Sequence, residues 1–255
     1  ALGGGKRFRP LLVLASAELF SVARLCAERV AAAVELVHCY SLAHDDLPCM
    51  DDDDLRRGRP TLHKAFDEAT AVLAGDALLT FAFEVLAAPH THGDPEVRSE
   101  LVRSLAVAAG GHGMVGGQVI DLAAEHQSLD LGSITRLQQL KTGALIAFAC
   151  EAGAILGKAS HAARHALHAY AHDLGLAFQI TDDLLDATGT AAETGKRVGK
   201  DAAAGKATFV SLLGLEPART QAAMLARQAS EHLDLFGEKA NLLREVAEFV
   251  IPRRA

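Results

Sequence analysis

The stretch from residue 44 to residue 60, HDDLPCMDDDDLRRGRP, constrains this chain more than any other. It places six aspartates within ten residues and follows them with three arginines. Carboxylates this close together repel one another unless cations and an anionic ligand offset their charge. Arginine side chains bind phosphate oxygens through charge-assisted hydrogen bonds. The stretch therefore indicates a site that holds divalent metal ions against phosphate.

A second acidic cluster lies far downstream, at residues 178–186 (FQITDDLLD). Asp182 and Asp186 are four residues apart, so a helix would place both on one face. Pro48 disfavours helical geometry just before it, so we expect the first helix to loosen there and Asp51 to return from a turn. An EF-hand is excluded because its alternating ligands, central glycine and final glutamate are missing. A solvated acidic loop is the alternative interpretation.

The composition favours helices. Alanine and leucine recur throughout, tryptophan is absent and aromatic residues make up 5% of the chain. We predict helices over residues 11–20, 27–46, 69–87, 96–110, 113–125, 133–156, 159–187, 207–213, 217–236 and 239–250, with no strand. With 255 residues and 50% hydrophobic composition, the chain can bury a large core, and we expect one all-α domain over residues 1–255.

Bulk charge and cysteine content exclude several classes of protein. A formal charge of −7 argues against a nucleic-acid partner. The four cysteines lack the spacing of a zinc ribbon or a disulfide framework, which favours a reducing cytoplasm. We see no run of eighteen apolar residues and no cleavable signal, so we expect no membrane span. The chain starts at Ala1 and enters a glycine-rich motif at once, so we expect residues ahead of it to be missing.

That motif is GGGKRFRP at residues 3–10. Its glycines let the backbone approach a ligand closely, while Lys6, Arg7 and Arg9 supply positive charge. It is not a Walker loop, because the GxxxxGK[ST] spacing is missing. A flexible leader before a helix is the structural alternative, but the two acidic clusters favour phosphate binding.

At these residues the sequence resembles the trans-type polyprenyl synthetases, most closely the bacterial farnesyl diphosphate synthases. The likeness rests on GGGKRFRP at 3–10, HCYSLAHDDLPCMDDDDLRRGRPTLHKAF at 38–66, LAGDALLTFAFEVLA at 73–87, GMVGGQVIDLAAE at 113–125, LKTGALI at 140–146, GLAFQITDDLLDATG at 175–189 and GKRVGKDAAAGKATF at 195–209. It implies a single-domain helical bundle of the isoprenoid synthase type around a central cavity, assembled as a homodimer.

The resemblance also implies that both acidic clusters bind Mg²⁺, three ions in all, against the diphosphate of an allylic substrate such as dimethylallyl or geranyl diphosphate. The implied metal ligands are Asp45, Asp46, Asp51, Asp182, Asp183 and Asp186. Arg56 and Lys141 would add positive charge. Breaking the C–O bond transfers negative charge to the diphosphate, so cations aimed there stabilise the transition state more than the ground state.

The same resemblance places a second diphosphate site, for isopentenyl diphosphate, on Lys6, Arg9, His38 and Arg57. The alkene of this substrate would attack the allylic cation, and the departing diphosphate would take the proton. Side chains implied to flank the cation or the diphosphate are Thr142, Gln179 and Lys196, with Lys206 near the closing segment.

Tyr40 and Ser41 are candidates for the wall that limits product length. On a helix, Ser41 lies one turn before Asp45 and Tyr40 lies about 7.5 Å from it along the axis. A bulky tyrosine there resembles the farnesyl enzymes, which make a fifteen-carbon product. Geranyl and geranylgeranyl diphosphate are the alternative products.

Other interpretations remain open. A terpene cyclase would carry a different second metal motif in place of DDLLD, and a non-catalytic partner subunit would be expected to have lost one acidic cluster. Four histidines share one helical face and could be zinc ligands, although an apolar stripe opposite them favours a plain polar face. They are His161, His165, His168 and His172.

Overall fold

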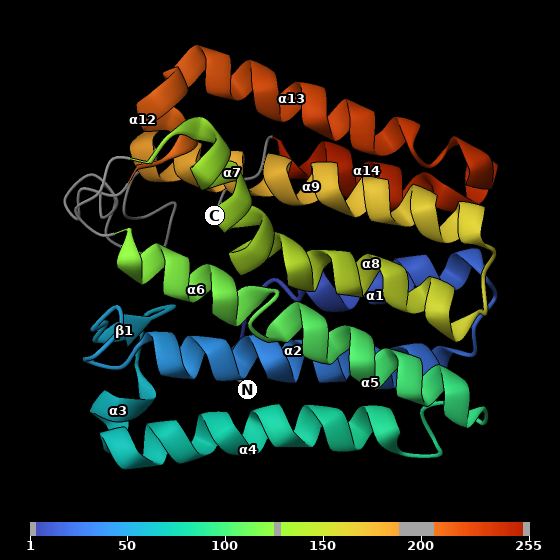
Figure 1. Ribbon diagram of the computed structural model, residues 1–255, viewed down its shortest axis with the longest axis horizontal. Coiled ribbons are helices and arrows are strands. Elements are labelled where there is room, and N and C mark those ends of the chain that lie inside the picture. Colours follow the sequence, from blue (N-terminus) through green and yellow to red (C-terminus); the bar gives the residue numbers. More distant parts are fainter. Residues whose placement is uncertain (1–3, 125–128, 189–206, 252–255) are drawn as a thin grey trace.

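The computed structural model describes residues 4–124, 129–188 and 207–251, and within these ranges the chain is a bundle of helices (Figure 1). This confirms the predicted all-α fold. The long helices are α1 (Phe8–Leu19), α2 (Arg24–Asp45), α4 (Glu68–Ala87), α5 (Pro95–Ala109), α6 (Met114–Ala123), α8 (Ala144–Leu156), α9 (His161–Thr188), α13 (Leu215–Glu231) and α14 (Asn241–Val250). Shorter elements are α3 (Leu62–Ala65), α7 (Leu131–Gln138), η1 (Gln139–Gly143), α12 (Phe209–Leu213) and η2 (Asp234–Ala240).

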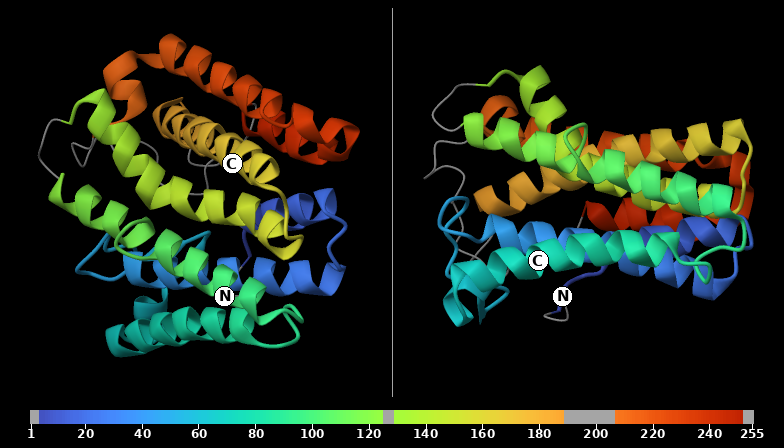
Figure 2. Two further views of the ribbon diagram at one scale, coloured as in Figure 1. Left: turned by 45° about the vertical axis from the view of Figure 1, so that its right-hand side comes forward. Right: turned by 60° about the horizontal axis from the view of Figure 1, so that its bottom comes forward.

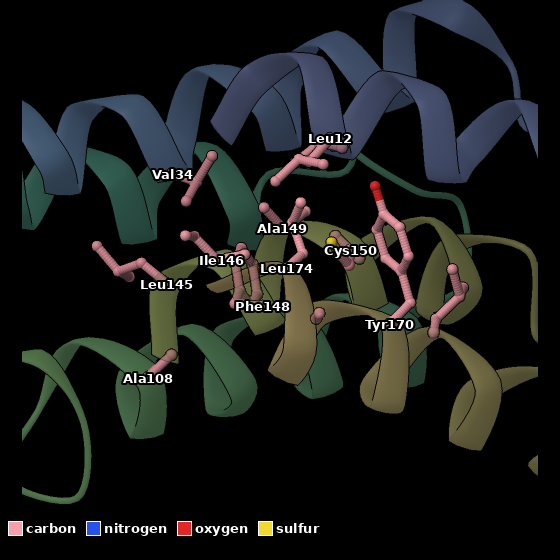
Figure 3. Close-up of a cluster of buried hydrophobic side chains, with 14 of the residues drawn as sticks. Leu12, Val34, Ala108, Leu145, Ile146, Phe148, Ala149, Cys150, Tyr170 and Leu174 are labelled. Carbon is pink, nitrogen blue, oxygen red and sulfur yellow. The ribbon is translucent and has the colours of Figure 1, made fainter. Parts of the chain in front are cut away.

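Helix α8 forms the centre of the core. It packs against α1, α2, α5 and α9, and ten of its residues are buried. Figure 3 shows Leu12 of α1, Val34 of α2 and Tyr170 of α9 converging on its side chains. The buried hydroxyl of Tyr170 donates a hydrogen bond to the Leu243 carbonyl oxygen at 2.8 Å, so α14 is tied to the same core. Close packing of this kind fixes the spacing of the helices that carry both acidic clusters.

The edges of the bundle are α13 on one side, packed on α9, and α4 on the other, packed on α2 (Figures 1 and 2). By length and composition alone, two stretches of the described residues could cross a membrane: Glu68–Ala87 and Leu131–Leu156. The second contains the core helix α8. The first is α4, whose apolar window is only 22% buried, so this helix presents an apolar face to its surroundings.

The break at Pro48 is confirmed. Helix α2 ends at Asp45, and the Asp51 N–H donates a hydrogen bond to the Asp45 carbonyl oxygen at 2.8 Å. The chain therefore turns back at once, and Asp51 returns to the end of α2 as the sequence predicted.

The prediction that the chain has no strand is wrong in one place. Strands β1 (Leu55–Arg56) and β2 (Arg59–Pro60) form a two-residue antiparallel ladder. Arg57 and Gly58 connect them, both with positive φ (54° and 73°), which is the geometry of a tight primed hairpin turn. Arginine and proline carry little strand propensity, so this hairpin depends on the turn and on its contacts rather than on the strand residues.

The helix predicted over residues 133–156 is also not uniform. A π-helical segment, η1, interrupts it at Gln139–Gly143. The helix predicted over residues 217–236 ends at Glu231 and is followed by the 3₁₀ segment η2. Both differences concern the local hydrogen-bond register, to which apolar periodicity is insensitive.

Candidate active site

The first acidic cluster sits where α2 ends. Burial raises the pKa of Asp45 to about 6, opposed by nearby Lys141 and reinforced by the like charge of Asp51. A buried carboxylate beside another carboxylate gains stability from any cation that joins it. Asp45 and Asp51, joined by the turn at Pro48, therefore offer oxygen ligands of the type that Mg²⁺ prefers.

The side chain of Asp46 is directed to the hairpin that follows α2. Its side chain is 4% exposed, and its Oδ1 accepts a hydrogen bond from the Nε of Arg56 at 2.7 Å. Burial alone would lower the pKa of Arg56, but the hydrogen bond to Asp46 raises it. Arg56 belongs to β1 and also lies 3.7 Å from Asp53 Oδ2. Asp46 thus fastens the hairpin to the end of α2.

The second cluster lies on α9. Asp182 and Asp186 are partly buried there, one turn apart, as predicted. Asp183 is 5% exposed and accepts hydrogen bonds from Gln179 Nε2 and from the Phe209 N–H, both at 2.9 Å. It therefore connects α9 to the start of α12.

The described residues contain no group of three or more His, Cys, Asp or Glu side chains arranged to hold a metal ion. The six predicted ligands thus do not form one ready-made coordination shell. The four histidines are not arranged as such a group among the described residues, and all four side chains are exposed. His168 pairs with Glu151 at 2.5 Å and His172 with Asp173 at 3.0 Å. These contacts support the interpretation of the row as a polar helix face.

Cationic side chains gather around the predicted second diphosphate site. Arg9 is only partly exposed, and its buried Nε has no hydrogen-bond partner among the described residues. Burial lowers the pKa of Arg9 to about 10. Burial, with Arg9 and Arg57 close by, lowers the pKa of His38 to about 2, so this imidazole is neutral. The Arg57 guanidinium bonds the Gly4 carbonyl oxygen and lies against Gly5, where a Cβ would overlap it. Lys6 follows in the same exposed loop.

Lys141 and Thr142 lie in the π-helical segment η1. Lys141 Nζ donates to Asp121 Oδ2 of α6 at 2.6 Å, and Thr142 Oγ1 donates to Gln179 Oε1 of α9 at 3.2 Å. A Cβ at Gly117 would overlap the Lys141 backbone, so this glycine lets α6 approach η1 closely. The segment therefore places two predicted catalytic side chains between α6 and α9.

Sequence reasoning missed three residues at these sites. Asp121 pairs with Lys141, Gln118 has a buried Nε2 without a hydrogen-bond partner among the described residues, and Glu35 pairs with Arg7. The glycine pair at 116–117 was a usable signal, because adjacent glycines inside a helix mark a close approach to another element.

Tyr40 is buried on α2, with 7% of its surface exposed. Its ring meets the His44 ring edge-on, with centroids 5.5 Å apart at 86°. His44 Nε2 lies 3.0 Å from the Val72 carbonyl oxygen of α4, and a Cβ at Gly75 would overlap the His44 ring. Ser41 donates to the His38 carbonyl oxygen at 3.0 Å. The predicted catalytic residue Lys196 and the predicted binding residue Lys206 lie outside the described residues.

Two acidic clusters and a group of cationic side chains on one helical bundle are the features of an enzyme that binds diphosphates with metal ions. Residues 1–245 match the polyprenyl synthetase family, and the chain belongs to it. The enzyme is a prenyltransferase, as the resemblance predicted.

Two curated relatives are equally similar in sequence. The chain is 46% identical to the farnesyl diphosphate synthase of Escherichia coli (strain K12), covering 99% of this chain and 86% of that protein. It is also 46% identical to geranylgeranyl pyrophosphate synthase 11, chloroplastic, of Arabidopsis thaliana, over 99% of this chain and 72% of that one.

Solved structures agree with this assignment. An FPP/GFPP synthase from Zymomonas mobilis, in an apo structure, has a TM-score of 0.90 and 57% identity over 98% of this chain and 85% of its own. A geranyltransferase from Helicobacter pylori, complexed with magnesium and isoprenyl diphosphate, has a TM-score of 0.86. It is 38% identical over 98% of this chain and 84% of its own. They confirm the isoprenyl synthase fold.

Proposed function

We propose that the protein condenses an allylic diphosphate, dimethylallyl or geranyl, with isopentenyl diphosphate and that its main product is farnesyl diphosphate. The observation that carries the proposal is the presence of two sites of opposite charge on α1, α2 and α9. One presents carboxylates that gain from cations. The other presents Arg9, whose buried Nε has no partner among the described residues and which gains from an anion.

The donor set fits Mg²⁺, because all of the candidate ligands are carboxylate oxygens. We propose Asp45, Asp51, Asp182 and Asp186 as the ligands, because these four side chains are partly or fully exposed. Asp46 and Asp183 are left out of the predicted set because they are only 4% and 5% exposed. The number of ions, three, is part of the proposal. Bound magnesium would supply Lewis-acid charge to the departing diphosphate.

The side chains of this protein would bind and orient the two diphosphate substrates. Lys6, Arg9 and Arg57 would hold the diphosphate of isopentenyl diphosphate, with His38 neutral at their centre. Lys141 and Arg56 would add charge on the allylic side. The allylic C–O bond breaks, the alkene of the second substrate forms the new C–C bond, and the departing diphosphate takes the proton. Lys196 and Lys206 belong to the same proposal.

Product length is assigned to Tyr40 and Ser41. Tyr40 is buried and backed by His44, which supports a rigid obstacle one to two turns before Asp45. Geranylgeranyl diphosphate is the strongest alternative, because a geranylgeranyl pyrophosphate synthase is as similar as a farnesyl enzyme. A non-catalytic partner subunit is a less favoured alternative, because neither acidic cluster is lost.

We further propose a cytoplasmic homodimer with neither a nucleic-acid partner nor a membrane span. A second copy of this chain would cover the apolar face of α4, where Val72, Leu73 and Phe81 are exposed. Neighbouring α5 and α6 add exposed Val107, Val115 and Val119. Exposed apolar side chains on neighbouring helices support a subunit interface at this face.

The test is an incubation with isopentenyl diphosphate, geranyl diphosphate and Mg²⁺, followed by chromatography of the dephosphorylated products. We expect a fifteen-carbon alcohol that disappears when EDTA replaces Mg²⁺. A twenty-carbon main product would overturn the assigned length, and the absence of any product would overturn the catalytic assignment.

A further inference from the structure

A continuous series of hydrogen bonds joins η1 to α12 through α9. Thr142 Oγ1 donates to Gln179 Oε1 at 3.2 Å, and Gln179 Nε2 donates to Asp183 Oδ1 at 2.9 Å. The other carboxylate oxygen of Asp183 accepts from the Phe209 N–H at 2.9 Å. These three hydrogen bonds tie together three elements that are distant in sequence, with the buried carboxylate of Asp183 between Gln179 and Phe209.

The direction of these bonds follows from Asp183. An ionised carboxylate only accepts hydrogen bonds, so the NH₂ group of Gln179 must face it. The amide oxygen of Gln179 is then turned to Thr142, whose hydroxyl hydrogen is used in that bond. One N–H of Gln179 is used by Asp183, while the Gln179 amide oxygen and the Thr142 hydroxyl oxygen both keep lone pairs for a ligand on the side away from Asp183. In a low-dielectric interior each bond polarises the next, which strengthens the arrangement.

We propose that Asp183 is a positioning residue for prenyl transfer: it fixes the Gln179 amide so that the oxygens of Gln179 and Thr142, rather than an N–H group, face the allylic carbon as it becomes positive. This inference rests on the proposed function and deepens it. Oxygen dipoles held toward a developing cation stabilise it without reorganising during the reaction. The second aspartate of the DDLLD motif thus acts through Gln179 rather than on metal.

The substitution Asp183→Asn tests the direction of the amide. The new side chain has only one acceptor group, and when it serves the Phe209 N–H its own NH₂ faces Gln179. Gln179 must then reverse, which turns its NH₂ toward Thr142. We expect kcat to fall roughly 10²- to 10³-fold, as when an oriented dipole is lost at a reacting centre. The KM values of both diphosphates should change little, since neither binding site is altered.

The second measurement separates positioning from metal binding. Mn²⁺ is added together with inorganic diphosphate, and its binding is measured by electron paramagnetic resonance. The wild type and Asp183→Asn should bind Mn²⁺ with the same affinity. Substitution of a true ligand would weaken Mn²⁺ binding, and that result would overturn the proposal. Asp173→Asn is the matched control, because Asp173 lies on the same helix with 14% exposure and, among the described residues, pairs with His172 and His232.

The reciprocal double variant provides rescue. In Asp183→Asn with Gln179→Glu, the carboxylate moves to position 179, where it accepts from the new amide and from Thr142. Oxygen again faces the reaction, so we expect at least a tenfold recovery of kcat over Asp183→Asn. If the single variant unfolds in thermal melts, the double variant carries the test, because the hydrogen bonds among positions 142, 179, 183 and 209 are paired again. A folded double variant without recovery overturns the proposal, whereas wild-type turnover tests the proposed function separately.

Discussion

The two acidic clusters look alike in sequence but differ in how their second aspartate is used. Asp46 and Asp183 are both almost fully buried, at 4% and 5% exposure. Asp46 pairs with a guanidinium only ten residues away, on the hairpin that follows it. Asp183 accepts from an uncharged amide and from a backbone N–H of a separate helix, 26 residues on.

The difference shows that the second aspartate of an acidic cluster can serve two structural purposes. The ion pair of Asp46 with Arg56 is local and charged, so it holds a hairpin in place beside the first cluster. The bonds of Asp183 are long-range and directional, so they orient a neighbouring side chain. The proposed metal ligands are the more exposed aspartates of the two clusters, Asp45, Asp51, Asp182 and Asp186. The variants below separate these roles.

The largest effect should come from the proposed metal ligands. Asp45→Ala and Asp182→Ala should each lower kcat by more than roughly 10³-fold, because charge stabilisation of the departing diphosphate is lost. Stability should hold or rise slightly in the metal-free protein, since a buried carboxylate that repels its neighbours is removed. Assays follow EDTA treatment and resupply of Mg²⁺, with exposed Asp234→Ala as the control. Near-normal turnover of either variant would refute the metal assignment.

The next effect tests the ion pair of the first cluster. Arg56→Met leaves Asp46 buried without its partner, which should lower the free energy of unfolding by about 3–5 kcal/mol. Combining it with Asp46→Leu removes both charges and should restore most of the lost free energy of unfolding. Chemical denaturation measures both variants. Equal instability of the single and double variants would mean that packing, rather than charge, explains the loss.

The third effect concerns the helix that leads into the first cluster. Tyr40→Ala should shift the main product from fifteen carbons to twenty or more, because the obstacle to the growing tail is removed. Truncation of this buried ring should also lower stability by about 3 kcal/mol. Chromatography of wild-type and variant products side by side measures the shift. An unchanged distribution would place the length stop on another helix.

The smallest effect should come from the cationic site. Arg9→Ala should raise the KM for isopentenyl diphosphate by roughly ten- to a hundred-fold, since a charge-assisted bond contributes about 1.5–3 kcal/mol. Lys6→Ala should act in the same direction, and the KM for geranyl diphosphate should barely change. Exposed Arg227→Ala is the control. Equal effects on both substrates would indicate that residues 3–10 are a structural element.

The parts of the fold that could be predicted are those set by local chemistry. The absence of an N–H on Pro48 and its clash with the preceding residue are local, so the end of α2 was predictable. The face shared by Asp182 and Asp186 follows from helical spacing alone. Helix content followed in the same way from composition and periodicity.

The parts that could not be predicted depend on tertiary partners. Nothing in DDLLD tells which aspartate faces Phe209, since that residue comes close only when α12 packs on α9. The π-helical register of η1 is equally invisible, because the same apolar residues fit an α-helix. The Lys141 to Asp121 ion pair joins segments twenty residues apart and needed the close approach at Gly117.

The imidazole of His44 packs against Gly75, and this contact limits the order in which substitutions at positions 44 and 75 can occur. A methyl group at position 75 would overlap that ring, which is held between Tyr40 and the Val72 carbonyl oxygen. Gly75→Ala by itself should therefore be unfavourable, by about 1–3 kcal/mol, yet become tolerable once a smaller side chain occupies position 44. A lineage that alters its product through this region would have to exchange His44 first and Gly75 afterwards.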